Sequence, residues 1–223
     1  MELILGIDDA GRGPVIGPMI LAGCLLDENS QNELKKLGVR DSKELTQKRR
    51  EFLVEKIKEK AETFEVEIIY PPEIDGKNAD GIMLNEVEAF ACANIINKIN
   101  KGYGKIKVVL DCPSVSLIKW GDFLKTQIEN LSNLEIVCEH KADKNHLAVS
   151  AASIIAKHTR EKEMEKLRKK YGPEIGSGYC SDPLTQKFLE KNLNKYDSDG
   201  IFRKTWETYK KAKEGLGQRR LNF

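Results

Sequence analysis

Four aspartates stand where predicted strands and helices begin or end. Asp8 and Asp9 end the first predicted strand, Asp111 ends a later strand, and Asp143 precedes a predicted helix. Strand ends that border a crevice collect ligands in sheets covered by helices, so Asp8 and Asp111 converge if their strands are neighbours. Grouped carboxylates favour Mg²⁺ or Mn²⁺, and two such ions suit in-line attack of water on a phosphodiester.

Each of these positions also has a purely structural interpretation. Asp9 fits an Asx turn, Asp111 fits the end of a strand, and Asp143 fits a helix N-cap. The spacing of the aspartates leaves both interpretations open.

Asp8 and Asp9 are neighbours, and strict strand alternation sends their side chains to opposite faces of a sheet. Both serve one site only if the strand bends or bulges there, which Gly11 and Gly13 make feasible. The run Gly11-Arg12-Gly13 fits a plain tight turn. Glycines beside an arginine also let backbone amides approach a substrate closely while the guanidinium meets a phosphate.

A second polar group, Asp41-Ser42-Lys43, falls in a predicted loop. It fits the start of a helix, with Ser42 or Thr46 as the cap. It equally fits a phosphate contact made by Lys43, and the spacing does not decide between the two.

The elements that must position these residues alternate between strands and helices. Apolar runs and spacing predict strands at residues 2–8, 15–26, 63–70, 105–111 and 134–140, and helices at 47–61, 84–99, 117–131 and from about 145 onward. This alternation predicts an α/β fold in which helices pack on a sheet.

The pattern changes after Gly172. Gly176 and Gly178 interrupt the chain, and two amphipathic helices follow, one carrying Leu189, Leu193 and Tyr196 and the other Phe202, Trp206 and Tyr209. We therefore expect a catalytic domain at residues 1–175 and a small helical region at residues 176–223.

Charge is distributed unevenly along the chain. The net charge of the 223 residues is only +2, but residues 157–170 hold seven Lys or Arg and three Glu, and residues 200–223 hold seven and two. Such runs fit either solvated helix faces or a surface that follows nucleic-acid phosphates.

Composition excludes several classes of protein. With 40% hydrophobic and 32% charged residues, the chain is neither disordered nor collagen-like. The longest apolar stretch, residues 15–26, is interrupted by Gly and Pro and is too short to cross a bilayer. The five cysteines are never spaced as CxxC, which disfavours disulfides and structural zinc. The opening residues lack a basic export segment, so we expect a cytoplasmic protein. The sequence shows no exposed heptad or obvious apolar seam, so we lean to a monomer.

Seven ordered segments resemble the type 2 ribonucleases H, the ribonuclease HII family, over nearly the whole chain. They are GIDDAGRGPVIGPM (6–19), DSKEL (41–45), VVLDCP (108–113), EHKAD (139–143), SAASIIAK (150–157), GSGYCSDPLT (176–185) and RKTW (203–206). The EHKAD form is most similar to the archaeal branch.

The resemblance implies a ribonuclease H-like fold with a mixed five-stranded sheet, flanking helices and a C-terminal helical region that helps to hold the duplex. It implies that Asp8, Asp9, Asp111 and Asp143 bind two divalent ions. It also implies that Gly11, Arg12, Gly13 and Tyr179 surround the 2′-hydroxyl of a ribonucleotide, the group that separates RNA from DNA. Lys43, Lys141 and Arg203 are further candidates for phosphate contacts.

One residue departs from the family pattern. Relatives generally carry Glu at the second acidic position, whereas this chain has Asp9, which is shorter by about 1.5 Å, one C–C bond. Metal ligands tolerate only small misplacement, so Asp9 needs a backbone shift or an intervening water. We expect activity to survive, with metal preference moved towards Mn²⁺.

The implied activity is metal-dependent hydrolysis of the RNA strand of RNA/DNA hybrids and cutting 5′ of ribonucleotides embedded in DNA, which belongs to ribonucleotide excision repair. Products would carry 3′-hydroxyl and 5′-phosphate ends, because the 2′-hydroxyl is recognised and does not attack. The tail resembles a sliding-clamp-binding peptide through Gln218, Leu221 and Phe223, although the chain ends after one aromatic residue; a frayed basic tail is the alternative.

Two rival functions remain open at this point. An actin-like phosphotransferase also begins with a strand and an aspartate-glycine turn, but that fold needs two such lobes. A non-catalytic protein that binds hybrids would need only the basic C-terminal helices. Loss of metal-dependent cleavage in Asp111→Ala separates a nuclease from such a binder.

Overall fold

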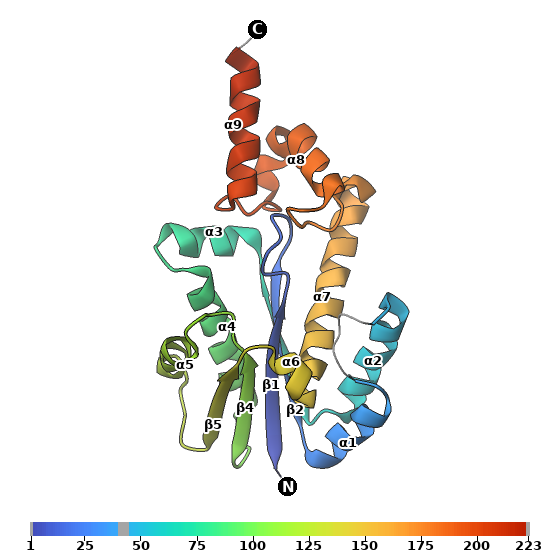
Figure 1. Cartoon of the computed structure of the whole chain (residues 1–223), viewed down its shortest axis with the longest axis vertical. Helices are drawn as coiled ribbons and strands as arrows, with labels where there is room; N and C mark the ends of the chain where they lie inside the picture. Colours follow the sequence, from blue (N-terminus) through green and yellow to red (C-terminus); the bar gives the residue numbers. More distant parts are fainter. Residues whose placement is uncertain (1, 40–44, 222–223) are drawn as a thin grey trace. The chain divides into compact units, whose positions relative to one another are not determined.

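The computed structural model describes residues 2–39 and 45–221 (Figure 1). Its elements in chain order are β1 (Leu3–Ala10), β2 (Met19–Leu26), α1 (Glu28–Lys36), α2 (Gln47–Lys60), β3 (Thr63–Ile69), α3 (Pro71–Ala79), α4 (Leu84–Ile99), β4 (Ile106–Asp111), α5 (Leu117–Thr126), β5 (Leu134–Glu139), α6 (Ala142–Asn145), α7 (Leu147–Tyr171), α8 (Pro183–Tyr196) and α9 (Glu207–Leu221). Short 3₁₀ helices lie at Pro173–Ile175 and Asp197–Asp199. Among the helices of these ranges, none is both long and apolar enough to cross a membrane.

The five strands form one mixed sheet in the order β3-β2-β1-β4-β5, which confirms the expected α/β fold. β1 pairs with β2 antiparallel and with β4 parallel, and β4 pairs with β5 parallel. All eight residues of β2 are buried, as expected for an uninterrupted apolar strand inside a sheet. β1 and β4 are therefore neighbours, and their carboxyl ends lie at the same edge.

Helices α4 and α7 pack against opposite faces of the sheet at two glycines. A Cβ at Gly23 would lie 2.4 Å from the Ile95 side chain of α4, and one at Gly6 would lie 2.1 Å from the backbone of Ala148 in α7. Gly23 pairs with Ile7, the residue that follows Gly6. Because consecutive strand residues face opposite sides, these contacts define an α4 face and an α7 face.

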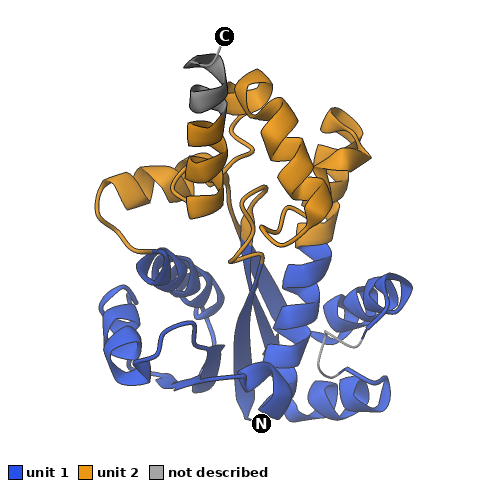
Figure 2. Ribbon diagram, turned by 45° about the horizontal axis from the view of Figure 1, so that its top comes forward, with its two compact units in different colours: residues 1–10, 20–67, 84–159 blue, residues 11–19, 68–83, 160–223 orange. Residues whose placement is uncertain are grey.

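The chain divides into two compact units (Figure 2). Unit 1 comprises residues 1–10, 20–67 and 84–159 and contains most of the sheet; unit 2 comprises residues 11–19, 68–83 and 160–223. The division differs from the linear boundary expected at residue 175, because unit 2 also takes in the second half of α7 and two earlier segments.

Unit 2 is organised around an apolar core shared by distant segments. Val15 and Ile16 pack there with Phe188 of α8 and with Phe202, and Ile16 and Phe202 form an isolated antiparallel bridge. The prediction that Phe202 shares a helix with Trp206 and Tyr209 is therefore wrong: α9 begins only at Glu207. Pairing with a strand-like segment far away in sequence overrides the local helical spacing.

Candidate active site

Three of the four predicted aspartates line one small cavity in unit 1. Asp8, Asp9 and Asp111 surround a space of about 10 Å³, room for about one water molecule. Glu88 of α4 lines the same cavity and is only 1% exposed, with both carboxylate oxygens buried. Four carboxylates therefore lie around one space at the carboxyl ends of β1 and β4.

Asp8 and Asp9 reach this cavity from different faces of the sheet. Asp8 shares the α7 face with Gly6 and accepts a hydrogen bond from the buried Ser153 hydroxyl of α7. Asp9 is on the α4 face with Ile7. Pairing with β2 continues regularly through Asp8 and Asp9, so the strand does not bulge here. Both side chains can line one cavity because the pairing of β1 with β4 ends at Ile7, which leaves the strand end open.

The electrostatics of the cavity centre on Asp8, which is 6% exposed. Burial, and next the charge of Asp9, raise the pKa of Asp8 to about 8; the charge of Asp111 adds to this, while the hydrogen bond from Ser153 opposes it. A carboxylate with this pKa holds a proton near neutral pH unless a cation replaces the proton.

Asp143 is buried in the short helix α6 and does not line this cavity. Its helix is tied to the site, because the N–H of Ala142 donates to Asp111 Oδ1 at 3.3 Å. The Ser150 hydroxyl of α7 donates to the Asp143 carbonyl. Lys141, at the N-cap of α6, has a left-handed backbone (φ 59°), uncommon for lysine, that starts this helix beside β4.

The donor chemistry of the cavity fits a hard divalent cation. Its polar side chains are carboxylates, which Mg²⁺ and Mn²⁺ prefer, and the raised pKa of Asp8 shows that negative charge is costly there. Across residues 2–39 and 45–221, no three His, Cys, Asp or Glu side chains are drawn together closely enough to enclose one ion. Buried carboxylates repel one another, so full convergence requires a counter-charge.

The glycine loop, residues 11–13, belongs to unit 2 and is held by Arg203. The Arg203 guanidinium donates to the carbonyls of Gly11 at 2.6 Å, Arg12 at 2.7 Å and Gly17 at 3.0 Å. Arg203 is completely buried. The sequence suggested that it contacts a phosphate; its side chain is instead committed to main-chain carbonyls of this loop.

Tyr179 and Trp206 flank the same loop. A Cβ at Gly13 would lie 4.0 Å from the ring of Tyr179, and the Trp206 indole N–H donates to the Gly13 carbonyl at 3.1 Å. Tyr179 is 42% exposed, and the guanidinium of Arg160 lies 5.1 Å from its ring centroid. Gly11, Arg12, Gly13 and Tyr179, predicted together from separate motifs, are therefore brought together in unit 2.

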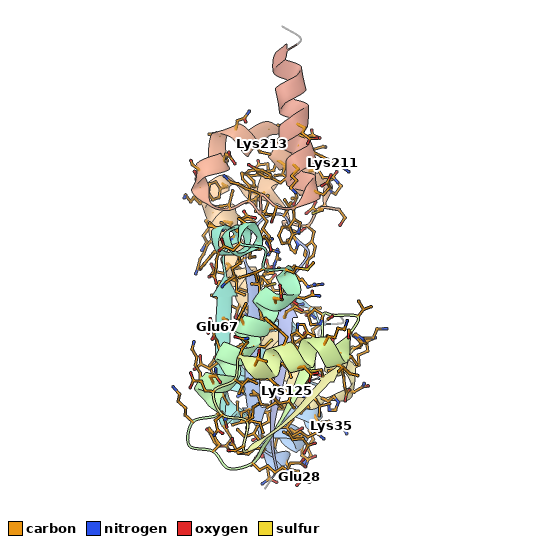
Figure 3. All side chains as sticks on the ribbon, turned by 90° about the vertical axis from the view of Figure 1, so that its left-hand side faces the viewer. Glu28, Lys35, Glu67, Lys125, Lys211 and Lys213 are labelled. Carbon is orange, nitrogen blue, oxygen red and sulfur yellow. The ribbon has the colours of Figure 1, made fainter. Side chains whose placement is uncertain are left out.

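Several lysines and arginines of the basic runs form ion pairs with neighbouring acids. In α7, Lys162 pairs with Glu165 at 3.3 Å. Lys211 and Lys213 of α9 are labelled in Figure 3. Lys211 pairs with Glu207 at 3.8 Å, and Lys213 pairs with Asp197 at 3.2 Å. These pairs favour solvated helix faces over a continuous phosphate-binding surface for these residues. Lys43 and Phe223 lie outside the described residues, as do the side chains of Gln218 and Leu221.

Comparison with known proteins identifies the family. The family model described as Ribonuclease HII matches residues 5–209. The chain belongs to the ribonuclease HII family. A curated ribonuclease HII of Thermococcus onnurineus is 42% identical over 217 residues, which cover 96% of this chain and 92% of that protein.

Solved structures agree with this assignment. The ribonuclease H2 of Pyrococcus horikoshii OT3 has a TM-score of 0.85 at 38% identity, covering 95% of this chain and 97% of that one. A ribonuclease HII solved in a complex with PCNA from Archaeoglobus fulgidus has a TM-score of 0.80 at 36% identity, covering 92% and 95%. A ribonuclease HIII (Bst-RNase HIII) in complex with Mn²⁺ shares the fold, with a TM-score of 0.82 at 19% identity, covering 98% and 71%.

Membership of the ribonuclease HII family makes this chain a type 2 ribonuclease H, an endonuclease that cleaves the RNA strand of RNA/DNA hybrids. Ribonucleases H as a family depend on divalent metal, and one neighbour of the same fold is solved with Mn²⁺. The ribonuclease H-like sheet expected from the resemblance is confirmed.

Sequence reasoning missed three side chains around these groups. Glu88 resembles an ordinary polar residue of an amphipathic helix, and Arg160 resembles one more charge in a basic run. Ser153 gave a weak indication, because a serine inside the apolar run SAASIIAK needs a hydrogen-bond partner once it is buried. Their roles depend on contacts that only the folded chain creates.

Proposed function

We propose that this ribonuclease HII also cuts duplex DNA 5′ of a single embedded ribonucleotide and thereby serves ribonucleotide excision repair. The observation that supports hydrolysis is the cavity that Asp8, Asp9 and Asp111 line together, with the pKa of Asp8 raised to about 8. Burying carboxylates together costs stability unless a cation neutralises them, and such a cost is typical of functional sites.

Asp8, Asp9, Asp111 and Asp143 would hold two Mg²⁺ or Mn²⁺ ions. When bound, such ions lower the pKa of a water molecule and neutralise the departing 3′-oxygen. Ser153 orients the Asp8 carboxylate by its hydrogen bond, and the N–H of Ala142 orients that of Asp111. These hydrogen bonds fix the carboxylates before substrate arrives, which reduces the reorganisation needed for reaction.

Substrate selection would fall to the glycine loop and Tyr179. Gly13 carries no side chain and is exposed, so the backbone of this loop can approach a ribose closely. Tyr179 exposes part of its ring beside Gly13 and can pack on the sugar. A hydroxyl at C2′ then adds hydrogen bonds that deoxyribose cannot make. Phosphate contacts by Lys43 and Lys141 remain predictions.

The test uses a DNA duplex with one ribonucleotide, incubated with Mg²⁺ or Mn²⁺. We expect cleavage just 5′ of the ribonucleotide, with 3′-hydroxyl and 5′-phosphate ends, and complete loss with EDTA. Asp111→Ala should bind the duplex without cutting it, whereas the exposed control Asp122→Ala should cut normally. Binding without cleavage by the wild-type protein in both metals would instead identify a non-catalytic hybrid-binding protein.

We also infer that the tail binds a sliding clamp through Gln218, Leu221 and Phe223. The sequence pattern supports this, as does the relative solved with PCNA. A tail peptide should bind the clamp, and the peptide with Leu221→Ala and Phe223→Ala should not; equal binding would dismiss the idea. The cytoplasmic location and the monomeric state are further predictions, and sedimentation at several concentrations tests the second.

A further inference from the structure

Unit 2 contains two buried guanidinium groups next to the glycine loop. Arg203 is 0% exposed and Arg160 is 8% exposed. A Cβ at Gly11 would lie 2.3 Å from Arg160 Nε, so this side chain packs directly against the loop that Arg203 holds by its carbonyls. Two buried positive charges therefore lie directly against the backbone of the glycine loop, residues 11–13.

No carboxylate of the described residues forms an ion pair with either group, and the charges of Glu161 and Asp75 compensate those of Arg160 and Arg203 only in part. Among the described residues, neither guanidinium forms an ion pair; Arg203 binds main-chain carbonyls, and Arg160 binds the Ser177 carbonyl at 3.0 Å. Arg160 Nε has no hydrogen-bond partner in the same part of the chain. Asp75 binds the backbone N–H groups of Lys204 and Thr205 instead.

Burying an unbalanced charge is costly, so proteins normally pair such groups. Burial lowers the pKa of Arg160, and burial together with the charge of Arg160 lowers the pKa of Arg203 to about 9. Arg203 is therefore still charged at neutral pH. Arg160 is charged as well, because a guanidinium does not lose its proton in proteins. An anion that approaches the loop would restore the balance.

The geometry of the peptide bond shows where such an anion would meet the loop. In a trans peptide the carbonyl and the following N–H point in opposite directions, and the described chain has no cis peptide. The carbonyls of Gly11 and Arg12 point at Arg203, so the N–H groups of Arg12 and Gly13 point away from it. Successive N–H groups directed to one side make an anion-binding concavity.

We propose that Arg160 and Arg203 are positioning residues whose buried charge gives the glycine loop its affinity for the phosphodiester beside the ribonucleotide. The charge attracts the anion, and the hydrogen bonds from Arg203 hold the two N–H groups in the orientation that receives it. This inference rests on the proposed function, because it assigns the glycine loop to the substrate.

Binding measured in EDTA tests the inference without requiring cleavage. The probe is a fluorescent DNA duplex with one ribonucleotide, compared with the all-DNA duplex of the same sequence. We expect Arg203→Gln to weaken binding of the ribonucleotide duplex about tenfold or more, and Arg203→Lys, which keeps the charge, to recover a large part of this loss. Lys204→Gln, a half-exposed neighbour, should bind normally.

Arg160 provides a second test if Arg203 variants fold poorly. Within the described residues its side chain makes a single hydrogen bond, to the Ser177 carbonyl, so Arg160→Gln should fold. This variant should also weaken binding about tenfold, and Arg160→Lys should weaken it less. Arg168→Gln is the control on the same helix, since Arg168 pairs with Glu161. The shift in melting temperature caused by Mn²⁺ should be the same in all variants, because the carboxylates belong to unit 1.

The outcomes separate this inference from the proposed function. At each arginine, the Gln and Lys variants are compared at equal concentrations of folded protein. If they bind the ribonucleotide duplex equally well, the arginines are only structural and the inference fails. If the wild type prefers the ribonucleotide duplex in an Arg203-dependent way but does not cleave it, the inference stands and the proposed function fails.

Discussion

The backbone N–H of Asp9 donates to Asp8 Oδ1 at 2.8 Å. This hydrogen bond favours the ionised form of Asp8. Burial and the charge of Asp9 outweigh it, however, and raise the pKa of Asp8 to about 8. Asp9 therefore both orients the Asp8 carboxylate and makes its ionisation costly. That cost can be measured as a change in the free energy of unfolding with pH.

Stability in EDTA should fall as pH rises from about 4 to 8. In this window the unfolded chain has an ionised Asp8 whereas the folded protein keeps it protonated, so the unfolded state binds fewer protons and rising pH favours unfolding. The loss should be on the order of 2 to 4 kcal/mol in urea unfolding at pH 8 relative to pH 5. Asp8→Asn should remove most of it; a variant with the wild-type pH dependence would contradict the assignment.

Cation binding should reverse this loss. Mn²⁺ or Mg²⁺ displaces the proton of Asp8, so the melting temperature at pH 8 should rise with the metal more than it does at pH 5. Equal shifts at both pH values would mean that the ions bind elsewhere.

Asp9→Glu should change metal preference. Asp9 reaches the cavity from the α4 face, and the added methylene lengthens the reach of its carboxylate by about 1.5 Å in the cavity that Asp8 and Asp111 also line. We expect Mg²⁺-supported activity to rise relative to Mn²⁺-supported activity. Titrations of both metals check this, with Asp122→Glu as the control. Identical titration curves for wild type and Asp9→Glu would contradict the hypothesis that Asp9 sets the metal preference.

Gly6→Ala should destabilise the protein strongly. A Cβ there would lie 2.1 and 2.2 Å from backbone atoms of Ala148 and Val149, which cannot move without shifting α7. We expect a loss of about 2 to 4 kcal/mol in unfolding free energy. Gly76 in α3 has nothing within 4 Å of its added Cβ, so Gly76→Ala should instead stabilise the helix by about 0.5 to 1 kcal/mol. Similar values for the two variants would refute the close packing.

Local sequence patterns predicted the sheet and the placement of three aspartates. Alternation and apolar runs locate all five strands, β1 to β5, to within a few residues, because each signal lies inside the element it describes. That Asp8 and Asp111 are near each other follows from the pairing of β1 with β4, which the sequence implied only conditionally.

The rest depended on contacts between distant segments. Arg203 is about 190 residues from the loop that it holds, and no local pattern indicates that distant contact. From the sequence, its charge suggested a phosphate contact, whereas in the structure its hydrogen-bond partners are backbone carbonyls. Phe202 showed helical spacing but pairs with Ile16. Helices α1 and α3 were missed, the second because Pro71 and Pro72 suggest a stop when they form its first turn.

Gly11 and Gly13 should respond differently to alanine. Gly11 has φ +80°, and its added Cβ would clash with the buried Arg160, so Gly11→Ala should lower stability by about 1 to 3 kcal/mol. An added Cβ at Gly13 meets only the Tyr179 ring, at 4.0 Å, so Gly13→Ala should change stability by less than about 0.5 kcal/mol.

If the backbone at Gly13 approaches the ribose, the well-folded Gly13→Ala variant should nevertheless lose affinity for the ribonucleotide duplex in EDTA while keeping its weak affinity for the all-DNA duplex. Unchanged affinity for both duplexes would show that the loop does not touch the sugar, because the methyl group would then occupy space that the substrate does not need.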